Sequence, residues 1–95
     1  MHTGILTLHI RLPGCDSLKA KRGRIKPLLA RLHKEFNVSA AEVDQLDSWQ
    51  EAVIACALVG NDGGHIDRHL RKLVGWLERH WPDIMLISEQ IEIIQ

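Results

Sequence analysis

The sequence is poor in cysteine and in long apolar runs, and each shortage removes a class of protein. Cys15 and Cys56 are the only two cysteines and stand far apart, without the spacing of a metal site. We expect free, buried thiols rather than a disulfide. The longest uncharged apolar stretch, residues 52–60, is too short to cross a bilayer. The first residues show no basic segment leading into an apolar core, so we expect a cytoplasmic protein without a signal peptide or a membrane partner.

What is present is an ordinary globular composition with an uneven charge distribution. The 95 residues are 45% hydrophobic and 25% charged, which predicts one domain over residues 1–95. Eight of the twelve Lys and Arg residues lie between Arg11 and Lys34, where Asp16 is the only acid. The stretch from Glu35 to Asp67 holds seven acids and no Lys or Arg. A net charge of zero thus conceals a polarised chain suited to a polyanion or a complementary protein surface.

The first half of the chain predicts a strand followed by a helix. Apolar residues alternate with others over residues 5–12, which is the period of a strand. Ser17 is placed to cap a helix that begins at Leu18, and Asn37 is placed to end it. The apolar residues of this helix fall on one stripe. Pro27 within it predicts a bend near Gly23 rather than a break.

The second half predicts two strands, a helix and a last strand. Residues 38–45 and 52–59 are predicted to be strands, and Asp62 is predicted to cap a second helix. The residues that this helix buries are Ile66, Leu70, Leu73, Val74 and Leu77. Residues 84–94 form the last strand, with an apolar row of one parity. The order βαββαβ predicts an α+β, ferredoxin-like fold: a four-stranded antiparallel sheet with two helices on one face.

Several short motifs resemble the YlxP family of short bacterial proteins across essentially the whole chain. They are Pro-Gly-Cys-Asp-Ser-Leu-Lys-Ala-Lys-Arg at 13–22, Phe-Asn-Val-Ser at 36–39, Ala-Glu-Val-Asp at 41–44, Asp-Ser-Trp-Gln at 47–50 and Leu-Val-Gly-Asn-Asp at 58–62. The resemblance implies a domain of unknown function with a ferredoxin-like fold. Genes of the family often lie beside those for translation initiation and for ribosome-binding factor A, which implies a role linked to RNA or the ribosome.

The basic first helix is the leading candidate site. At 100° per residue, Lys19, Arg22 and Lys26 share one flank of the apolar stripe, and Lys34 lies on the solvent side. Arg24 and Arg31 lie on the opposite flank. Such a helix can contact the phosphates of RNA, each contact adding a salt-sensitive term to affinity. The plain alternative is a solvated face whose long side chains cover the rim of the core.

Asp47 and Trp49 lie in the connection between the second and third strands and are candidate partner-binding residues. Trp49 does not belong to the apolar pattern of either flanking strand, so the core does not explain a large aromatic side chain at this position. It suits a stacking platform for a base or an anchor for a protein. The structural alternative is a loop Trp folded over the end of the core, with Asp47 bonded to backbone amides.

His65 and His69 are four residues apart on the second helix, a spacing that can share a metal. No Cys or acid at ligand spacing completes the set, so we interpret both as residues at the boundary of the core and expect no metal or cofactor.

Three known uses of this fold lack their motifs here. A metal-carrying domain needs Cys-x-x-Cys after the first strand. Here Leu18 stands where the second cysteine after Cys15 would be. RNA-recognition modules stack bases on aromatics of the first and third strands, where this chain has none. The loop at residues 13–17 lacks the phosphate-binding Arg of an acylphosphatase. No nucleophile, base and orienting group can be assembled, so we do not expect an enzyme.

Two function classes therefore stand. The first is a non-enzymatic module that binds RNA or a ribosomal particle through Lys19, Arg22, Arg24, Lys26, Arg31 and Lys34. The second is a protein-interaction or self-assembling module. A homodimer of this kind would use either the acidic region at residues 42–51 or the open sheet face, with Ile5 and part of the apolar row of the last strand.

Overall fold

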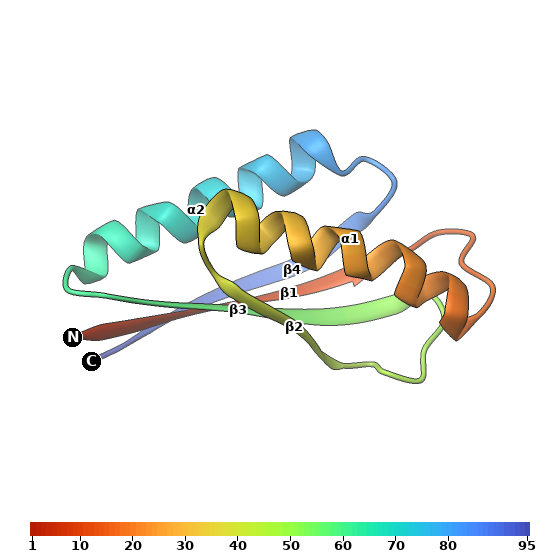
Figure 1. The fold of residues 1–95 in the computed structure, drawn as a ribbon, viewed down its shortest axis with the longest axis horizontal. Helices are drawn as coiled ribbons and strands as arrows, with labels where there is room; N and C mark the ends of the chain where they lie inside the picture. The colour runs from red at the N-terminus through yellow and green to blue at the C-terminus, as the bar shows by residue number, and fades with distance from the viewer.

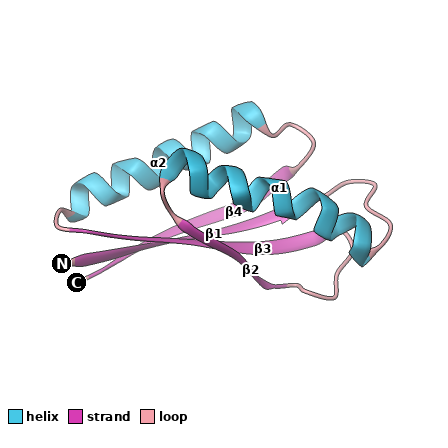
Figure 2. Cartoon of the chain, viewed as in Figure 1, coloured by secondary structure: helices cyan, strands magenta, loops and turns pink.

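Six elements follow one another in the predicted order βαββαβ (Figure 1). The structure is a computed structural model that describes residues 1–95. Its elements are β1 (His2–Arg11), α1 (Leu18–Phe36), β2 (Ser39–Asp44), β3 (Glu51–Gly60), α2 (Gly63–His80) and β4 (Met85–Ile94). The strands form one antiparallel sheet in the order β2-β3-β1-β4, and both helices cover the same face of it (Figure 2). The predicted α+β, ferredoxin-like fold is confirmed.

The core lies between the two helices and the sheet because every strand alternates. Leu6, Leu8 and Ile10 of the central strand β1 are fully buried under the helices. Thr7 and His9 between them point to the uncovered face, as successive strand residues do. The 18 apolar residues of this single cluster come from both helices, from β1 and β3, and from the segments beside them.

The helix ends follow the predicted capping residues. The Ser17 Oγ accepts a 3.0 Å hydrogen bond from the Ala20 N–H, and Asn37 ends α1 in the left-handed region at φ 53°. The Asp62 Oδ1 accepts a 3.1 Å bond from the His65 N–H, and this bond lowers the pKa of the Asp62 carboxyl. α1 runs unbroken through Pro27.

The limits of the strands differ from the prediction, and a bulge in β4 changes the sheet face on which some of its side chains lie. β1 begins three residues earlier, at His2, and β2 is shorter at both ends than residues 38–45. β4 carries one extra residue between the partners of His9 and Ile10. This bulge resets the alternation, so the apolar row of β4 is divided between the two faces rather than lying on one.

Two further predictions concern the thiols and the membrane. Cys15 and Cys56 are both free and buried, as expected. Burial raises the pKa of the Cys56 thiol to about 12 because the thiolate loses its hydration. Among the helices, neither is long and apolar enough to cross a membrane.

Candidate nucleic-acid interface

Four of the six candidate cations of α1 are free of partners. Lys19, Arg22, Lys26 and Lys34 are all exposed, and none makes a hydrogen bond or ion pair within the chain. Lys19, Arg22 and Lys26 lie at helical spacing on the flank of α1 opposite Arg24 and Arg31, which places them away from α2. Their charges are available to an external anion.

Arg24 is engaged inside the molecule. One of its terminal nitrogens donates to the carbonyl of Pro13 at 3.0 Å, and the other donates to the carbonyl of Asp83 at 2.7 Å. The Asp83 carboxylate lies 3.9 Å away. The guanidinium therefore joins the loop before α1 to the loop after α2, and we leave it out of the interface.

Arg31 is engaged on the same side. Its guanidinium lies 5.3 Å above the centre of the Trp76 ring and 3.5 Å from the Glu35 carboxylate. A cation over an aromatic face with a carboxylate beside it has little free charge to offer a phosphate. The structure thus divides the six candidate cations into four free ones and two that fasten α1 to its surroundings.

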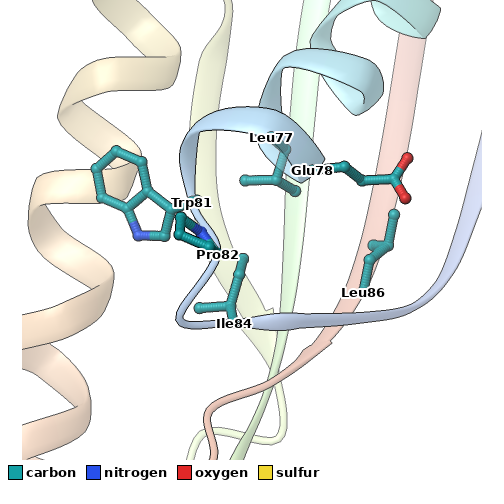
Figure 3. A pocket seen from close by; sticks show the side chains of 6 residues that line it. All are labelled: Leu77, Glu78, Trp81, Pro82, Ile84 and Leu86. Atoms are coloured by element: carbon teal, nitrogen blue, oxygen red, sulfur yellow. The ribbon is translucent and has the colours of Figure 1, made fainter.

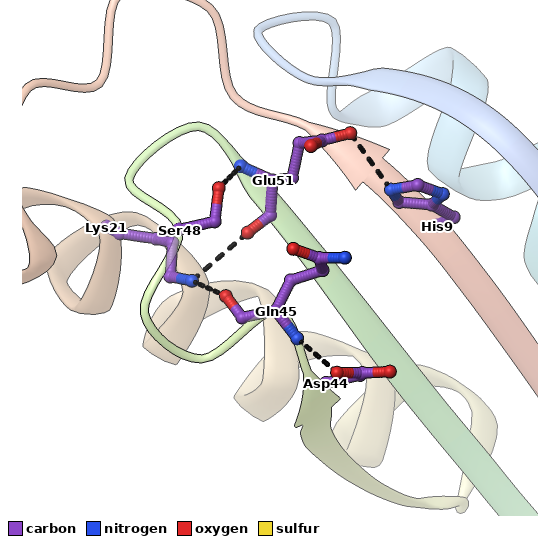
Figure 4. Close-up of polar contacts among 6 residues, drawn as sticks. All are labelled: His9, Lys21, Asp44, Gln45, Ser48 and Glu51. Carbon is purple, nitrogen blue, oxygen red and sulfur yellow. Dashed lines mark hydrogen bonds and ion pairs between the residues drawn. The ribbon is translucent and has the colours of Figure 1, made fainter.

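Lys21 is the one cation of α1 to which the sequence analysis assigned no role. Its side chain is 1% exposed, and its Nζ donates to the carbonyls of Gln45 at 2.8 Å and Glu51 at 3.1 Å (Figure 4). The Glu42 Oε2 lies 2.7 Å from the same nitrogen, at an angle outside hydrogen-bond geometry, so Glu42 contributes charge alone. Lys21 thereby holds both ends of the β2–β3 loop against α1.

Other bonds make the β2–β3 loop, residues 45–50, a fixed structure. The Asp44 Oδ1 accepts from the Gln45 N–H at 2.8 Å, and the Ser48 Oγ accepts from the Glu51 N–H at 3.1 Å (Figure 4). Gln45 itself adopts the left-handed backbone at φ 59°. Neither bond involves Asp47, which has no partner within the chain, so its expected bonding to backbone amides is absent.

Trp49 does not fold over the end of the core. Its side chain is 54% exposed and has no aromatic partner, in contrast to Trp76 and Trp81. It borders a hollow of about 330 Å³ lined by Arg11, Ser48, Trp49, Gln50 and Glu51. The structural alternative given above for Trp49 therefore does not hold, and its indole faces solvent.

The acidic region is partly neutralised within the chain. Glu42 pairs with Lys21, and the Glu51 Oε1 lies 3.1 Å from the His9 Nε2. Of the four acids at residues 42–51, only Glu42 pairs with a Lys or Arg, and Glu51 has a hydrogen-bonding contact with His9. This weakens the version of self-assembly in which that region docks on the basic helix of another copy.

The apolar row of the last strand, predicted to share one parity, is divided between the covered face and the open sheet face. Met85 pairs with Arg11 on that face, as expected for part of the row of the last strand. Ile91 and Ile93, however, pair with Leu6 and Gly4 and lie on the face that the helices cover. The bulge in β4 is the reason for this correction.

His69 is half-buried, as expected of a boundary residue, whereas His65 is exposed and stacks on it with ring centres 6.2 Å apart. The His69 Nε2 lies 2.7 Å from the carbonyl oxygen of Phe36, so one of its ring nitrogens is already engaged. Both rings border a hollow of about 410 Å³ at the C-terminal end of α1. No group of three potential metal ligands occurs in the structure.

A separate hollow of about 300 Å³ lies where α2 gives way to β4 (Figure 3). Leu77, Trp81, Ile84 and Leu86 line it together with Pro82, and Glu78 is its one charged side chain. It offers no cation to a polyanion and lies apart from the free face of α1.

Two comparisons with known proteins agree with the motifs. Residues 3–91 match a family described as a protein of unknown function, DUF503. The chain is 31% identical over 68 residues to the uncharacterized protein YlxP of Bacillus subtilis (strain 168), covering 72% of this chain and 73% of that protein. The chain therefore belongs to the DUF503 family of YlxP-like proteins.

Proposed function

We propose that this protein is a non-enzymatic cytoplasmic module that binds RNA or a ribosomal particle through α1. The single observation that carries the proposal is the free state of Lys19, Arg22, Lys26 and Lys34 beside engaged Arg24 and Arg31. Arg68, Lys72 and Arg79 of α2 are also exposed and unpaired, but Lys19, Arg22 and Lys26 are grouped more closely, within about two turns on one flank. Free cations that follow one helix can instead neutralise successive phosphates of an RNA backbone.

Contacts of this kind position a phosphate backbone without reading its sequence. The first and third strands present no aromatic side chain to the open face, so the base-stacking of an RNA-recognition module has no counterpart there. Binding is therefore led by charge and shape. The gene neighbourhood implied by the YlxP resemblance favours RNA over other polyanions.

Charge reversal at the free flank tests the proposal. Lys19→Glu, Arg22→Glu and Lys26→Glu together should weaken binding of a fluorescent RNA by more than about a hundredfold at low salt. The matched control carries Arg68→Glu, Lys72→Glu and Arg79→Glu, which make the same charge change at exposed positions of α2. Equal losses in both variants, or no loss in a folded α1 variant, would refute the proposed surface.

Self-association is the second candidate function, and exposed apolar side chains favour it. Val59, Met85, Ile87 and Ile94 are between 44% and 63% exposed on β3 and β4. A dimer formed by burying such side chains should persist at several hundred millimolar salt, whereas charge docking should loosen there. Gel filtration across a salt series decides between a dimer of either kind and a monomer.

A further inference from the structure

The hollow beside Trp49 combines an aromatic face with groups that bind the edge and the phosphate of a nucleotide. Trp49 offers an indole that is 54% exposed, and Arg11 is an exposed cation without a partner in the chain. Gln50 adds a side-chain amide that both donates and accepts. The Glu51 carboxylate, whose Oε1 faces His9, completes the lining.

The backbone on both sides of Trp49 is held by hydrogen bonds. The Leu12 N–H donates to the Gln50 carbonyl at 2.7 Å, so the residues next to Arg11 and Trp49 are bonded to each other. Lys21 holds the loop ends, and Ser48 bonds Glu51. A backbone held by this many bonds keeps the Cα of Trp49 in place before any ligand arrives, which lowers the entropic cost of ordering the loop on binding.

The same bonds join the loop that carries Trp49 to the basic helix α1. Lys21 lies between Lys19 and Arg22 on α1, and its Nζ reaches the loop that carries Trp49. One turn of helix thus supplies both the free cations and the anchor of the aromatic loop. The side chains of Arg11 and Glu51 lie on the open face of the sheet, so the hollow opens on the side of the sheet away from the helices.

Resting on the proposed function, we propose that this hollow is a nucleobase site for single-stranded RNA. An unpaired base stacks on the Trp49 indole, and the Gln50 amide and the Glu51 carboxylate are positioned to bond its edge. Arg11, the cation of the hollow, holds an adjoining phosphate. A base paired within a duplex has no free face to offer the indole, so the site selects single-stranded over double-stranded RNA.

The test titrates the protein with three labelled or competing probes: a single-stranded RNA of about twelve nucleotides, a duplex of the same length, and inorganic polyphosphate of matched charge. Trp49→Ala should lower the affinity for single-stranded RNA about tenfold and change the affinities for the other two probes by less than about twofold. The slope of log affinity against log salt should stay unchanged because no cation is removed. Trp49→Phe, which keeps an aromatic face, should recover most of the loss.

The matched control is Leu46→Ala, a truncation of an apolar side chain that is 57% exposed in the same loop but does not line the hollow. A loss in this control equal to that of Trp49→Ala would indicate a disturbed loop and overturn the base site. Equal losses with RNA and polyphosphate would overturn it too.

The base site and the proposed function fail in different ways. If Trp49→Ala binds single-stranded RNA as the unaltered protein does, while charge reversal on α1 abolishes binding, the base site is wrong and the RNA surface stands. If Trp49→Ala lowers binding to a ribosomal particle but not to naked RNA, Trp49 contacts a protein, which also overturns the base site. If the unaltered protein binds neither RNA nor polyphosphate at low salt, both proposals are wrong.

Discussion

The Nζ of Lys21 lies 2.7 Å from the Oε2 of Glu42, and this buried ion pair joins α1 to the edge strand β2. The same nitrogen satisfies the carbonyls of Gln45 and Glu51, so one lysine closes the β2–β3 loop. Lys21 thereby anchors the loop that carries Trp49 to the helix that carries the free flank. The most basic segment of the chain and an acidic one meet here inside the fold.

Replacing Lys21 should therefore destabilise the fold strongly. Lys21→Met leaves two carbonyls without a donor and Glu42 without its counter-charge, which should lower the free energy of unfolding by about 2–4 kcal/mol. Urea unfolding measures the change. Lys26→Met, at an exposed position of the same helix, is the control and should fall within about 0.5 kcal/mol of the unaltered protein.

A second change identifies the cause of that loss. Adding Glu42→Gln to Lys21→Met removes the uncompensated carboxylate, so part of the lost stability should return. If the double variant is less stable than Lys21→Met by the full cost of Glu42→Gln alone, the two side chains do not interact, and the clamp described here is wrong.

Replacing Gly4 or Gly23 by alanine should change the stability of the protein in opposite directions. A Cβ on Gly4 would run into the side chain of Ile66, where α2 packs closely on β1. Gly4→Ala should destabilise the protein by about 1–3 kcal/mol through overpacking. Gly23 lies in α1 with open space around it, so Gly23→Ala should stabilise by about 0.5–1 kcal/mol through helix propensity. Thermal unfolding of both variants decides, and the same sign for both would contradict the packing described here.

The two cysteines should be inert to thiol reagents in the native protein. Cys56 is fully buried and its pKa is raised to about 12, so its thiolate is scarce at pH 9, and Cys15 is also buried. Ellman's reagent should show less than about a tenth of one thiol promptly at pH 8. In denaturant, both thiols should react. Prompt reaction of one thiol in the folded protein would mean that the core opens at that site.

The fold was predictable because its signals are local. The alternation of β1, the apolar stripe of α1 and the caps Ser17, Asn37 and Asp62 each depend on a few neighbouring residues. The bulge in β4 was missed because it appears only in the pairing with β1. Its effect was to move Ile91 and Ile93 to the covered face.

The candidate site was only half predictable. Helical spacing separates the flank of Lys19, Arg22 and Lys26 from that of Arg24 and Arg31. It does not show that the acceptors of Arg24 lie on Pro13 and Asp83, since those carbonyls belong to distant loops. The same holds for Lys21, because the carbonyls that it bonds belong to residues 24 and 30 positions away in the sequence.

The most direct measurement is co-sedimentation of the protein with purified ribosomal subunits over a salt series from about 50 to 500 mM, with gel filtration of the free protein alongside. We expect saturable binding to one subunit that weakens as salt rises and is lost when Lys19, Arg22 and Lys26 are changed to Glu. Absence of binding even at the lowest salt would contradict the proposed RNA-linked function and leave the protein–protein alternative.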